Sequence, residues 1–76
     1  MPRLTPQSWK VLEAVFLRDG FVFARQASSH RVYEKPDVLR PLIIPQYEEI
    51  DVDIIRGLLR TAAMPRSRYF ELLKKI

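Results

Sequence analysis

Three short segments that favour β-structure lie close together in the middle of this chain, at residues 21–26, 30–35 and 39–44. Each is rich in aromatic or β-branched side chains. Only a few residues separate neighbouring segments, whereas a parallel pair of strands needs a crossover of about a dozen residues. The sequence therefore predicts an antiparallel, three-stranded meander. Pro41 lacks an amide donor, so it should lie on a sheet edge or at the start of the third strand.

A helix is expected before the strands, over about residues 6–18. Thr5 and Pro6 suit its cap and its first position, and Gly20 can adopt the left-handed conformation that ends a helix. Its apolar residues recur at three- and four-residue spacing. They are Trp9, Leu12, Val15 and Phe16.

Two further helices are expected after the strands. Asp51 and Asp53 precede the first, where acidic side chains favour a helix N-terminus, and Pro65 can open the second. The apolar positions are Ile54, Ile55, Leu58, Leu59 and Ala62 in the first, and Tyr69, Phe70, Leu72 and Leu73 in the second.

The order α-β-β-β-α, followed by a short C-terminal helix, predicts an α+β fold. Helices packed on one face of a three-stranded sheet bury one apolar layer and leave the other face of the sheet open. The 76 residues are expected to form a single domain, residues 1–76. A domain of this size buries only about 60% of the surface of its unfolded chain.

The composition excludes several classes of protein. The chain contains no cysteine, which rules out disulfides, thiolate metal sites and a thiol nucleophile. No apolar run approaches the roughly 18 residues of a membrane helix, and residues 1–6 do not resemble a signal peptide. A cytoplasmic protein without membrane association is therefore expected.

The net charge of +4 is unevenly distributed. Residues 48–53 carry four acidic side chains and no basic one, whereas residues 54–76 carry six basic side chains against a single acidic one. A basic surface attracts polyanions, although a soluble, arginine-rich protein would have the same composition. Four arginines could reach RNA phosphates, acidic groups on a partner, or only solvent: Arg56, Arg60, Arg66 and Arg68.

Metal catalysis is not expected. The acidic stretch 48–53 is the only cluster of possible ligands. Its spacing fits no calcium loop and suits a helix start with a solvated face. The aromatic residues fall on apolar helix or strand positions and are expected in the core rather than on a stacking platform. They are Trp9, Phe16, Phe21, Phe23 and Phe70.

His30 is the only histidine, and it lies where the second strand is expected to begin. Imidazole can take or give a proton near neutral pH. Strand alternation places His30 on one face of this strand and Arg31, Tyr33 and Lys35 on the other. The alternative role for a lone histidine at a strand start is a partly exposed residue that hydrogen-bonds a turn.

Several short motifs occur in a characteristic order between Ser8 and Leu73. They are Asp19-Gly20-Phe21, Arg25-Gln26, Ser29-His30, Tyr33, Ile44-Pro45, Glu49-Ile50, Leu58-Leu59-Arg60, Ala62 and the stretch 69–73. In order and spacing they resemble the HicA family of toxins. The resemblance implies the same α-β-β-β-α order, similar to double-stranded RNA-binding domains. It also implies an mRNA interferase of a stress-responsive type II toxin-antitoxin pair, which cleaves mRNA and binds a HicB-like antitoxin in a hetero-oligomer.

Three positions depart from the family pattern. Ser28 stands where the family usually has glycine, Tyr47 where a second histidine often occurs, and Ala63-Met64-Pro65 where Gly-Leu-Ser usually precedes the last helix. Serine is less favourable than glycine at a positive φ angle, so Ser28 should stiffen the turn before His30. The missing histidine removes a possible partner in proton transfer.

The resemblance gives His30 the role of general acid or base in RNA cleavage that needs no metal and no cofactor. Such cleavage requires a base for the 2′-hydroxyl proton, an acid for the leaving oxygen and cations for the phosphate charge. Arg25, on the neighbouring strand, is its expected helper. The other expected RNA-binding residues are Ser29 beside the turn, Arg31 and Lys35 for phosphates, and Tyr33 for stacking or hydrogen bonding.

Two other functions fit the same residues. A non-catalytic module similar to double-stranded RNA-binding domains would read the shape of A-form RNA. A protein-interaction module would instead dock an acidic partner on the basic helix that contains Arg56 and Arg60. RNA cleavage, RNA binding and the effect of His30→Ala distinguish these functions.

Overall fold

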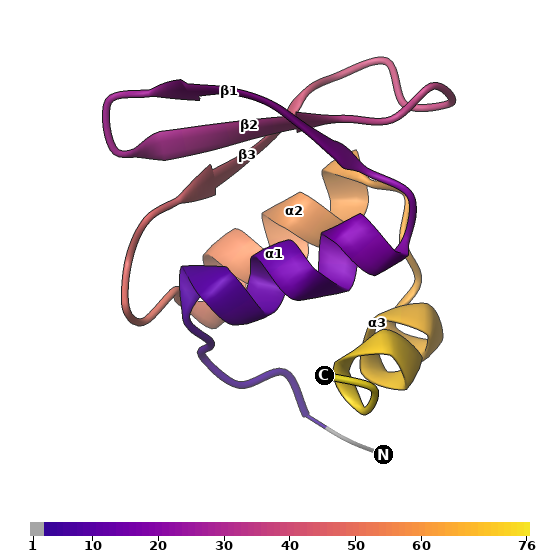
Figure 1. Ribbon diagram of the computed structural model, residues 1–76. Helices are drawn as coiled ribbons and strands as arrows, with labels where there is room; N and C mark the ends of the chain where they lie inside the picture. Colours follow the sequence, from indigo (N-terminus) through magenta and orange to yellow (C-terminus); the bar gives the residue numbers. More distant parts are fainter. Residues whose placement is uncertain (1–2) are drawn as a thin grey trace.

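The structure, a computed structural model, describes residues 3–76. Met1 and Pro2, which begin the expected N-terminal segment and the expected domain, lie outside the described residues. The elements follow the predicted order (Figure 1), which confirms the α+β fold class. They are α1 (Trp9–Arg18), β1 (Val22–Ala27), β2 (His30–Glu34), β3 (Leu42–Pro45), α2 (Val52–Thr61) and α3 (Arg66–Leu73). Within residues 3–76 no helix combines the length and the apolar character needed to cross a membrane.

The strands form the predicted antiparallel meander, in the order β1-β2-β3. The third strand is shorter than the expected segment 39–44, because it begins at Leu42, opposite Tyr33. Pro41 lies directly before this edge strand, where its missing amide hydrogen costs no ladder hydrogen bond. Leu39 is fully exposed in the loop that precedes it.

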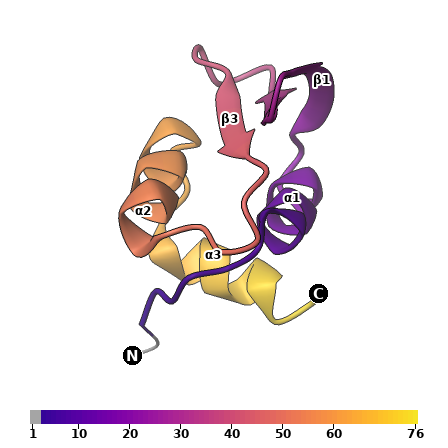
Figure 2. The same ribbon diagram turned by 90° about the vertical axis from the view of Figure 1, so that its left-hand side faces the viewer.

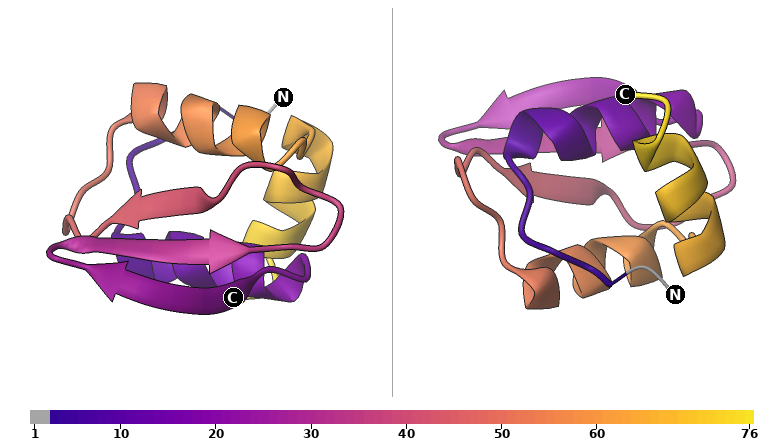
Figure 3. Two further views of the ribbon diagram at one scale, coloured as in Figure 1. Left: turned by 90° about the horizontal axis from the view of Figure 1, so that it is seen from above. Right: turned by 90° about the horizontal axis from the view of Figure 1, so that it is seen from below.

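The helices lie on one side of the sheet, as predicted (Figure 1). Figure 2 shows α1 and α2 below the strands, on opposite sides of the molecule. Helix α3 spans the space between them at one end (Figure 3). Apolar side chains fill the space between the layers, and the largest of them include Tyr33, Tyr69, Phe16 and Phe21. The other face of the sheet is uncovered by any helix in residues 3–76.

The first helix begins later than expected, and Ser8 rather than Thr5 is its N-cap. The Ser8 hydroxyl accepts a hydrogen bond from the Val11 amide at 3.4 Å, which satisfies one of the free donors of a helix start. Gln7 remains outside the helix because it pairs with Ile50 through backbone hydrogen bonds of 2.7 and 3.3 Å. This long-range pairing keeps the preceding chain extended.

Helix α1 ends at Arg18, and Gly20, two residues later, adopts the left-handed conformation that was predicted to end it. Gly20 has a φ angle of +104°, and the Phe21 amide donates to the Phe16 carbonyl at 3.1 Å. The two phenylalanine rings pack edge to face with their centroids 5.7 Å apart. Together these contacts form a Schellman motif, which turns the chain from α1 into β1.

The two later helices begin where the sequence predicts. Asp51 is the N-cap residue of α2 and Asp53 lies in its first turn, although the Asp51 side chain makes no capping hydrogen bond. Both carboxylates therefore act through the helix dipole. Pro65 directly precedes α3, whose first residue is Arg66.

Candidate active site

His30 is the first residue of β2 and follows a two-residue hairpin loop. Ala27 and His30 face each other across this loop, so Ser28 and Ser29 form the whole connection. Ser28 has a φ angle of +58°, a conformation that glycine adopts more readily than serine. The expected positive φ is confirmed, and the serine Cβ restricts the turn that presents His30.

Two glutamine side chains fasten this loop to the sheet. The side-chain amide of Gln26 donates to the Ser28 carbonyl at 3.1 Å and to the side-chain oxygen of Gln46 at 2.7 Å. The backbone amide of Gln46 donates to the Ser29 carbonyl at 2.8 Å. No sequence signal marks Gln46, because its contacts depend on the register of β3 against β2.

The His30 side chain is exposed on the uncovered face of the sheet. Tyr33, Leu42 and Ile44 point to the other face, where they join the core with the helices. Successive strand residues alternate between faces, so His30 points away from the helices. We call this surface the His30 face.

A β-bulge in β1 brings Arg25 onto the His30 face. The register shifts between Phe23 and Arg25, which leaves Ala24 as the extra residue. Phe23 lies on the helix side, and strict alternation would place Arg25 there as well. The bulge instead sets Arg25 opposite Val32. Arg25 thereby becomes a diagonal neighbour of His30, at a Cα separation of about 7–8 Å.

The polar groups of the His30 face are free to meet a ligand. Within residues 3–76, no side-chain hydrogen bond involves the His30 imidazole, and no ion pair involves Arg25. Ser29 is exposed beside them. His30 and Arg25 share this face of the sheet, and Ser29 belongs to the loop that adjoins it.

Arg31 and Tyr33 lie on the helix side of β2, as alternation predicts, and both bind Glu13 of α1. The Arg31 Nε and Nη2 atoms lie 3.1 and 3.0 Å from one carboxylate oxygen of Glu13. The Tyr33 hydroxyl donates to the same oxygen, and Arg31 Nε donates to that hydroxyl at 3.0 Å. Burial, and then the hydrogen bond to Glu13, raises the pKa of Tyr33 to about 12. We call this group the Glu13 cluster.

Two aromatic rings flank the Arg31 guanidinium. Its carbon lies 5.3 Å from the centre of the Trp9 ring and 4.3 Å from that of the Phe23 ring, within the range of cation–π attraction. Of the aromatics expected in the core, Phe16 and Phe21 are buried there. Trp9 and Phe70 pack against the core, whereas Phe23 is 45% exposed because β1 is an edge strand.

Lys35 lies beyond the far end of β2. Five residues separate it from His30, which corresponds to about 16 Å along an extended strand. Its ammonium group pairs with Asp19 at 3.3 Å and lies 5.6 Å from the centre of the Phe21 ring. The structure therefore does not bring Lys35 to the His30 face.

Around His30, the His30 face offers one proton-transfer group beside one cation, Arg25, and Glu34 lies farther along β2 on the same face. An imidazole can serve as general acid or base, and a guanidinium binds phosphate with two parallel hydrogen bonds. Across residues 3–76, no three His, Asp or Glu side chains are grouped in a way that could hold a metal ion.

Comparison with known protein families matched residues 9–64 to the HicA toxin of bacterial toxin-antitoxin systems. The matched segment runs from the start of α1 to just beyond α2 and contains the whole sheet. Neither the curated proteins nor the solved structures gave a match. HicA toxins pair with antitoxins and are generally ribonucleases. Because the match covers more than half of the sequence, the chain belongs to the HicA family of toxins.

Proposed function

We propose that this protein is a metal-independent endoribonuclease, an mRNA interferase, in which His30 is the general acid or base. The proposal is carried by the position of His30. It is exposed on the uncovered face of the sheet, diagonal to Arg25, and makes no side-chain hydrogen bond within residues 3–76. Membership of a family whose toxins are generally ribonucleases supports RNA as the substrate. An mRNA substrate in turn implies that the protein acts in the cytoplasm.

The 2′-hydroxyl of the RNA is the nucleophile in this reaction. As a neutral imidazole, His30 takes the 2′-hydroxyl proton while the oxygen attacks the adjacent phosphorus. The 5′-oxygen then leaves with the electrons of the broken P–O bond and receives a proton. As an imidazolium, His30 would supply that proton instead. Such a group contributes about 10²–10⁴-fold to the rate, and DNA is not cleaved because deoxyribose lacks the hydroxyl.

Arg25 and Ser29 complete the proposed RNA contacts around His30. Arg25 binds the phosphate and offsets the negative charge that grows on it. The Ser29 hydroxyl, next to His30 in the chain, donates a hydrogen bond to a phosphate or ribose oxygen. Neither role requires the backbone to move, because the hairpin is already fastened through Gln26 and Gln46.

The positions of Arg31, Tyr33 and Lys35 favour structural roles over the RNA contacts expected from the sequence. Tyr33 is fully buried, so its ring has no free face on which a base could stack. Arg31 points to the helix side and is held by the Glu13 carboxylate. Lys35 is paired with Asp19 at the other end of the strand. We therefore assign these three side chains to the fold.

A HicB-like antitoxin is proposed to cover the His30 face. Val22 and Ile43 are 60% and 46% exposed, and the register places both on this face, opposite Glu34 and Val32. Exposed apolar side chains beside charged ones favour contact with a protein partner. The resulting hetero-oligomer would keep RNA away from His30.

Induced expression of the parent protein and of His30→Ala tests this function. The parent is expected to stop growth and degrade transcripts, whereas His30→Ala does neither while accumulating to the same level. Lys75→Ala, an exposed change near the C-terminus, should behave like the parent. Equal toxicity of His30→Ala and the parent would show that the catalytic assignment is wrong.

Binding experiments separate the two alternative functions. A protein that binds duplex RNA in a salt-sensitive way but never cleaves it is the non-catalytic module. A protein that has no RNA affinity and purifies with an acidic partner is the interaction module. Our proposal requires cleavage of RNA by the isolated parent protein.

A further inference from the structure

A second basic surface lies at the opposite end of the sheet from the His30 hairpin. Two adjoining hollows meet there, of about 420 and 510 Å³, and both are lined by Arg60 and Ala63. Their arginines come from the loop between β2 and β3, from α2 and from the start of α3. We call this surface the arginine groove, and its arginines are Arg40, Arg56, Arg60 and Arg66.

The charges of the arginine groove are largely uncompensated. Within residues 3–76, no ion pair involves Arg40, Arg60 or Arg66. Arg56 pairs only with Asp53, at 2.9 Å on an exposed helix face, and such pairs contribute little. Among the residues that the structure describes, Asp37 is the only acidic one that lines either hollow. Cations that converge from three segments and outnumber the acidic groups beside them attract a polyanion.

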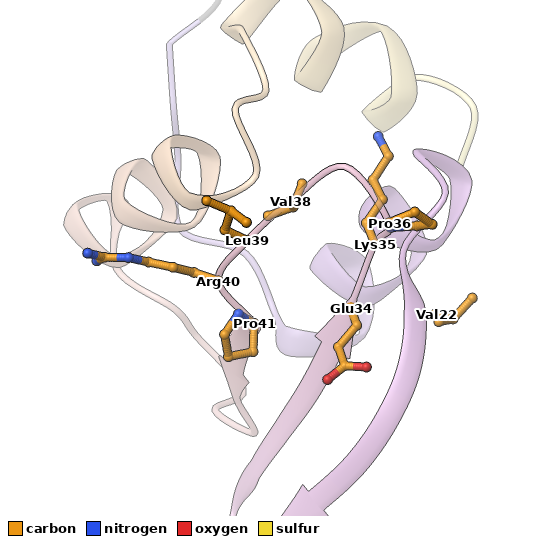
Figure 4. A pocket seen from close by; sticks show the side chains of 8 residues that line it. All are labelled: Val22, Glu34, Lys35, Pro36, Val38, Leu39, Arg40 and Pro41. Atoms are coloured by element: carbon orange, nitrogen blue, oxygen red, sulfur yellow. The ribbon is translucent and has the colours of Figure 1, made fainter.

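The arginine groove is continuous with the His30 face. A further hollow is lined by Val22 and Glu34 on the strands and by residues 38–40 on the loop (Figure 4). It shares this loop segment with the first hollow of the arginine groove. Glu34 lies four residues along β2 from His30, about 13 Å. The hollows therefore adjoin one another from Val22 and Glu34, on the His30 face, past the loop to the arginine groove. An RNA strand bound along them would pass the Glu34 carboxylate.

We propose that the arginine groove binds the phosphate backbone of the RNA strand that is cleaved at His30, several nucleotides away from the cleaved bond. The inference rests on the proposed function and adds a second substrate contact to it. Continuity with the His30 face favours RNA over an acidic protein segment as the occupant. Within residues 3–76, no aromatic side chain lines the hollows, so the proposed contact is to phosphates and involves no stacking on bases.

The arrangement of the groove suits a row of phosphates. Arg56 and Arg60 are four residues apart on α2, so their Cα atoms are separated by about 6 Å along the helix. Each phosphate neutralised on a single strand contributes about −0.7 to the slope of log affinity against log salt. Loss of three arginines should therefore reduce the magnitude of this slope by about 2.

The test compares two triple variants, each made in a His30→Ala background so that the RNA stays intact. The groove variant carries Arg40→Gln, Arg60→Gln and Arg66→Gln. The control carries Arg18→Gln, Lys74→Gln and Lys75→Gln, which remove the same charge outside the hollows. Thermal unfolding checks that both fold. The probe is a fluorescein-labelled single-stranded RNA of about 20 nucleotides, titrated by anisotropy between about 50 and 200 mM salt.

The groove variant should bind this RNA at least about ten-fold more weakly than the control, with a salt slope smaller by about 2. The inference would be overturned if the two triple variants bound the RNA of about 20 nucleotides with equal affinity and equal salt dependence. It would also be overturned by a groove variant that keeps its RNA affinity and loses only the binding of an acidic protein.

Failure of this inference can be told apart from failure of the proposed nuclease. Binding is measured without cleavage, so a protein that never cuts RNA could still show groove-dependent affinity. Conversely, both triple variants can be made with His30 intact, and the KM of each for cleavage of the RNA of about 20 nucleotides can be measured. Equal KM values in two proteins that cut RNA would support the nuclease function and refute the second contact.

Discussion

Neighbouring residues of β2 have different roles, because successive strand side chains point alternately to the uncovered face of the sheet and to the helices. His30 points to the uncovered face of the sheet, whereas Arg31 is held between Trp9, Phe23 and the Glu13 carboxylate. A partly buried ion pair whose groups also make further hydrogen bonds keeps its geometry better than an exposed pair does. The Glu13 cluster therefore fixes β2 against α1, and with it the strand that begins at His30.

Tyr33 should make the protein sensitive to alkaline unfolding. Its pKa is raised from an ordinary value of 10 to about 12 in the folded protein, so the unfolded chain releases this proton first. The stabilisation is complete below pH 10 and is lost as the pH rises to about 12. A shift of about two units corresponds to roughly 2–3 kcal/mol.

Tyr33→Phe isolates this contribution. The variant should be less stable than the parent by about 1 kcal/mol at pH 8, because it lacks hydrogen bonds within the Glu13 cluster. Its stability should then fall less than that of the parent between pH 10 and pH 12. Urea unfolding at several pH values measures the stability difference at pH 8 and the loss between pH 10 and pH 12. Lysine side chains also titrate in this range, but they do so in both proteins and cancel in the comparison. An identical alkaline loss in parent and variant would contradict the assignment.

Only some positions of the candidate-site residues could be predicted from the sequence. The opposite faces of His30 and Arg31 follow from alternation alone. The position of Arg25 does not, because the bulge at Ala24 reverses the alternation of β1. Glu13 and Gln46 carry no local signal, since each acts through contacts between segments distant in the sequence.

At the scale of elements, helix ends set the direction of the chain, and one of them is strained. The Met64 amide donates to the Leu59 carbonyl at 2.9 Å, which makes the end of α2 resemble that of α1. The left-handed position is Ala63, with a φ angle of +53°, rather than glycine. A residue with a Cβ is unfavourable there.

Ala63→Gly should therefore stabilise the protein by about 0.5–1 kcal/mol, since it relieves this strain. Gly57→Ala is the matched change in the interior of α2, where an added Cβ meets nothing within 4 Å. It should also stabilise, by about 1 kcal/mol. Gly20→Ala should destabilise by about 1–2 kcal/mol, because Gly20 has a φ angle of +104°.

Thermal and urea unfolding of the three variants measure these differences. The sign of each stability change is diagnostic. Glycine should be favoured over alanine at positions 20 and 63, where φ is positive, and alanine over glycine at position 57, inside the helix. If Ala63→Gly lowered stability as much as an ordinary helix glycine does, the end of α2 would not be strained.

The order of the elements could be predicted from apolar spacing and short connections, but their boundaries depended on long-range contacts. Thr5 and Pro6 have the chemistry of a helix start, yet the bridge between Gln7 and Ile50 holds that part of the chain extended. The third strand begins three residues later than its apolar run suggests, because Pro41 cannot join the ladder. Tertiary pairing overrode local propensity in the first place, whereas the missing amide hydrogen of Pro41 shortened the strand in the second.

At the scale of the whole molecule, layering explains how so small a chain offers a surface for a large substrate. The helices cover one face of the sheet and bury its apolar side chains (Figure 1). The other face carries His30 and Arg25 and leads into the arginine groove. In the proposed account, this division lets one face stabilise the fold while the other binds RNA or an antitoxin.

The central claim, RNA cleavage by His30 without a metal ion, is tested most directly with purified protein in the presence of a chelator. The parent should cut single-stranded RNA into fragments with 5′-hydroxyl ends and leave the matching DNA intact. His30→Ala should cut about 10²–10⁴-fold more slowly with unchanged thermal stability, because the side chain is exposed. Cleavage by His30→Ala at the parent's rate, or cleavage that stops when the chelator is added, would contradict the account.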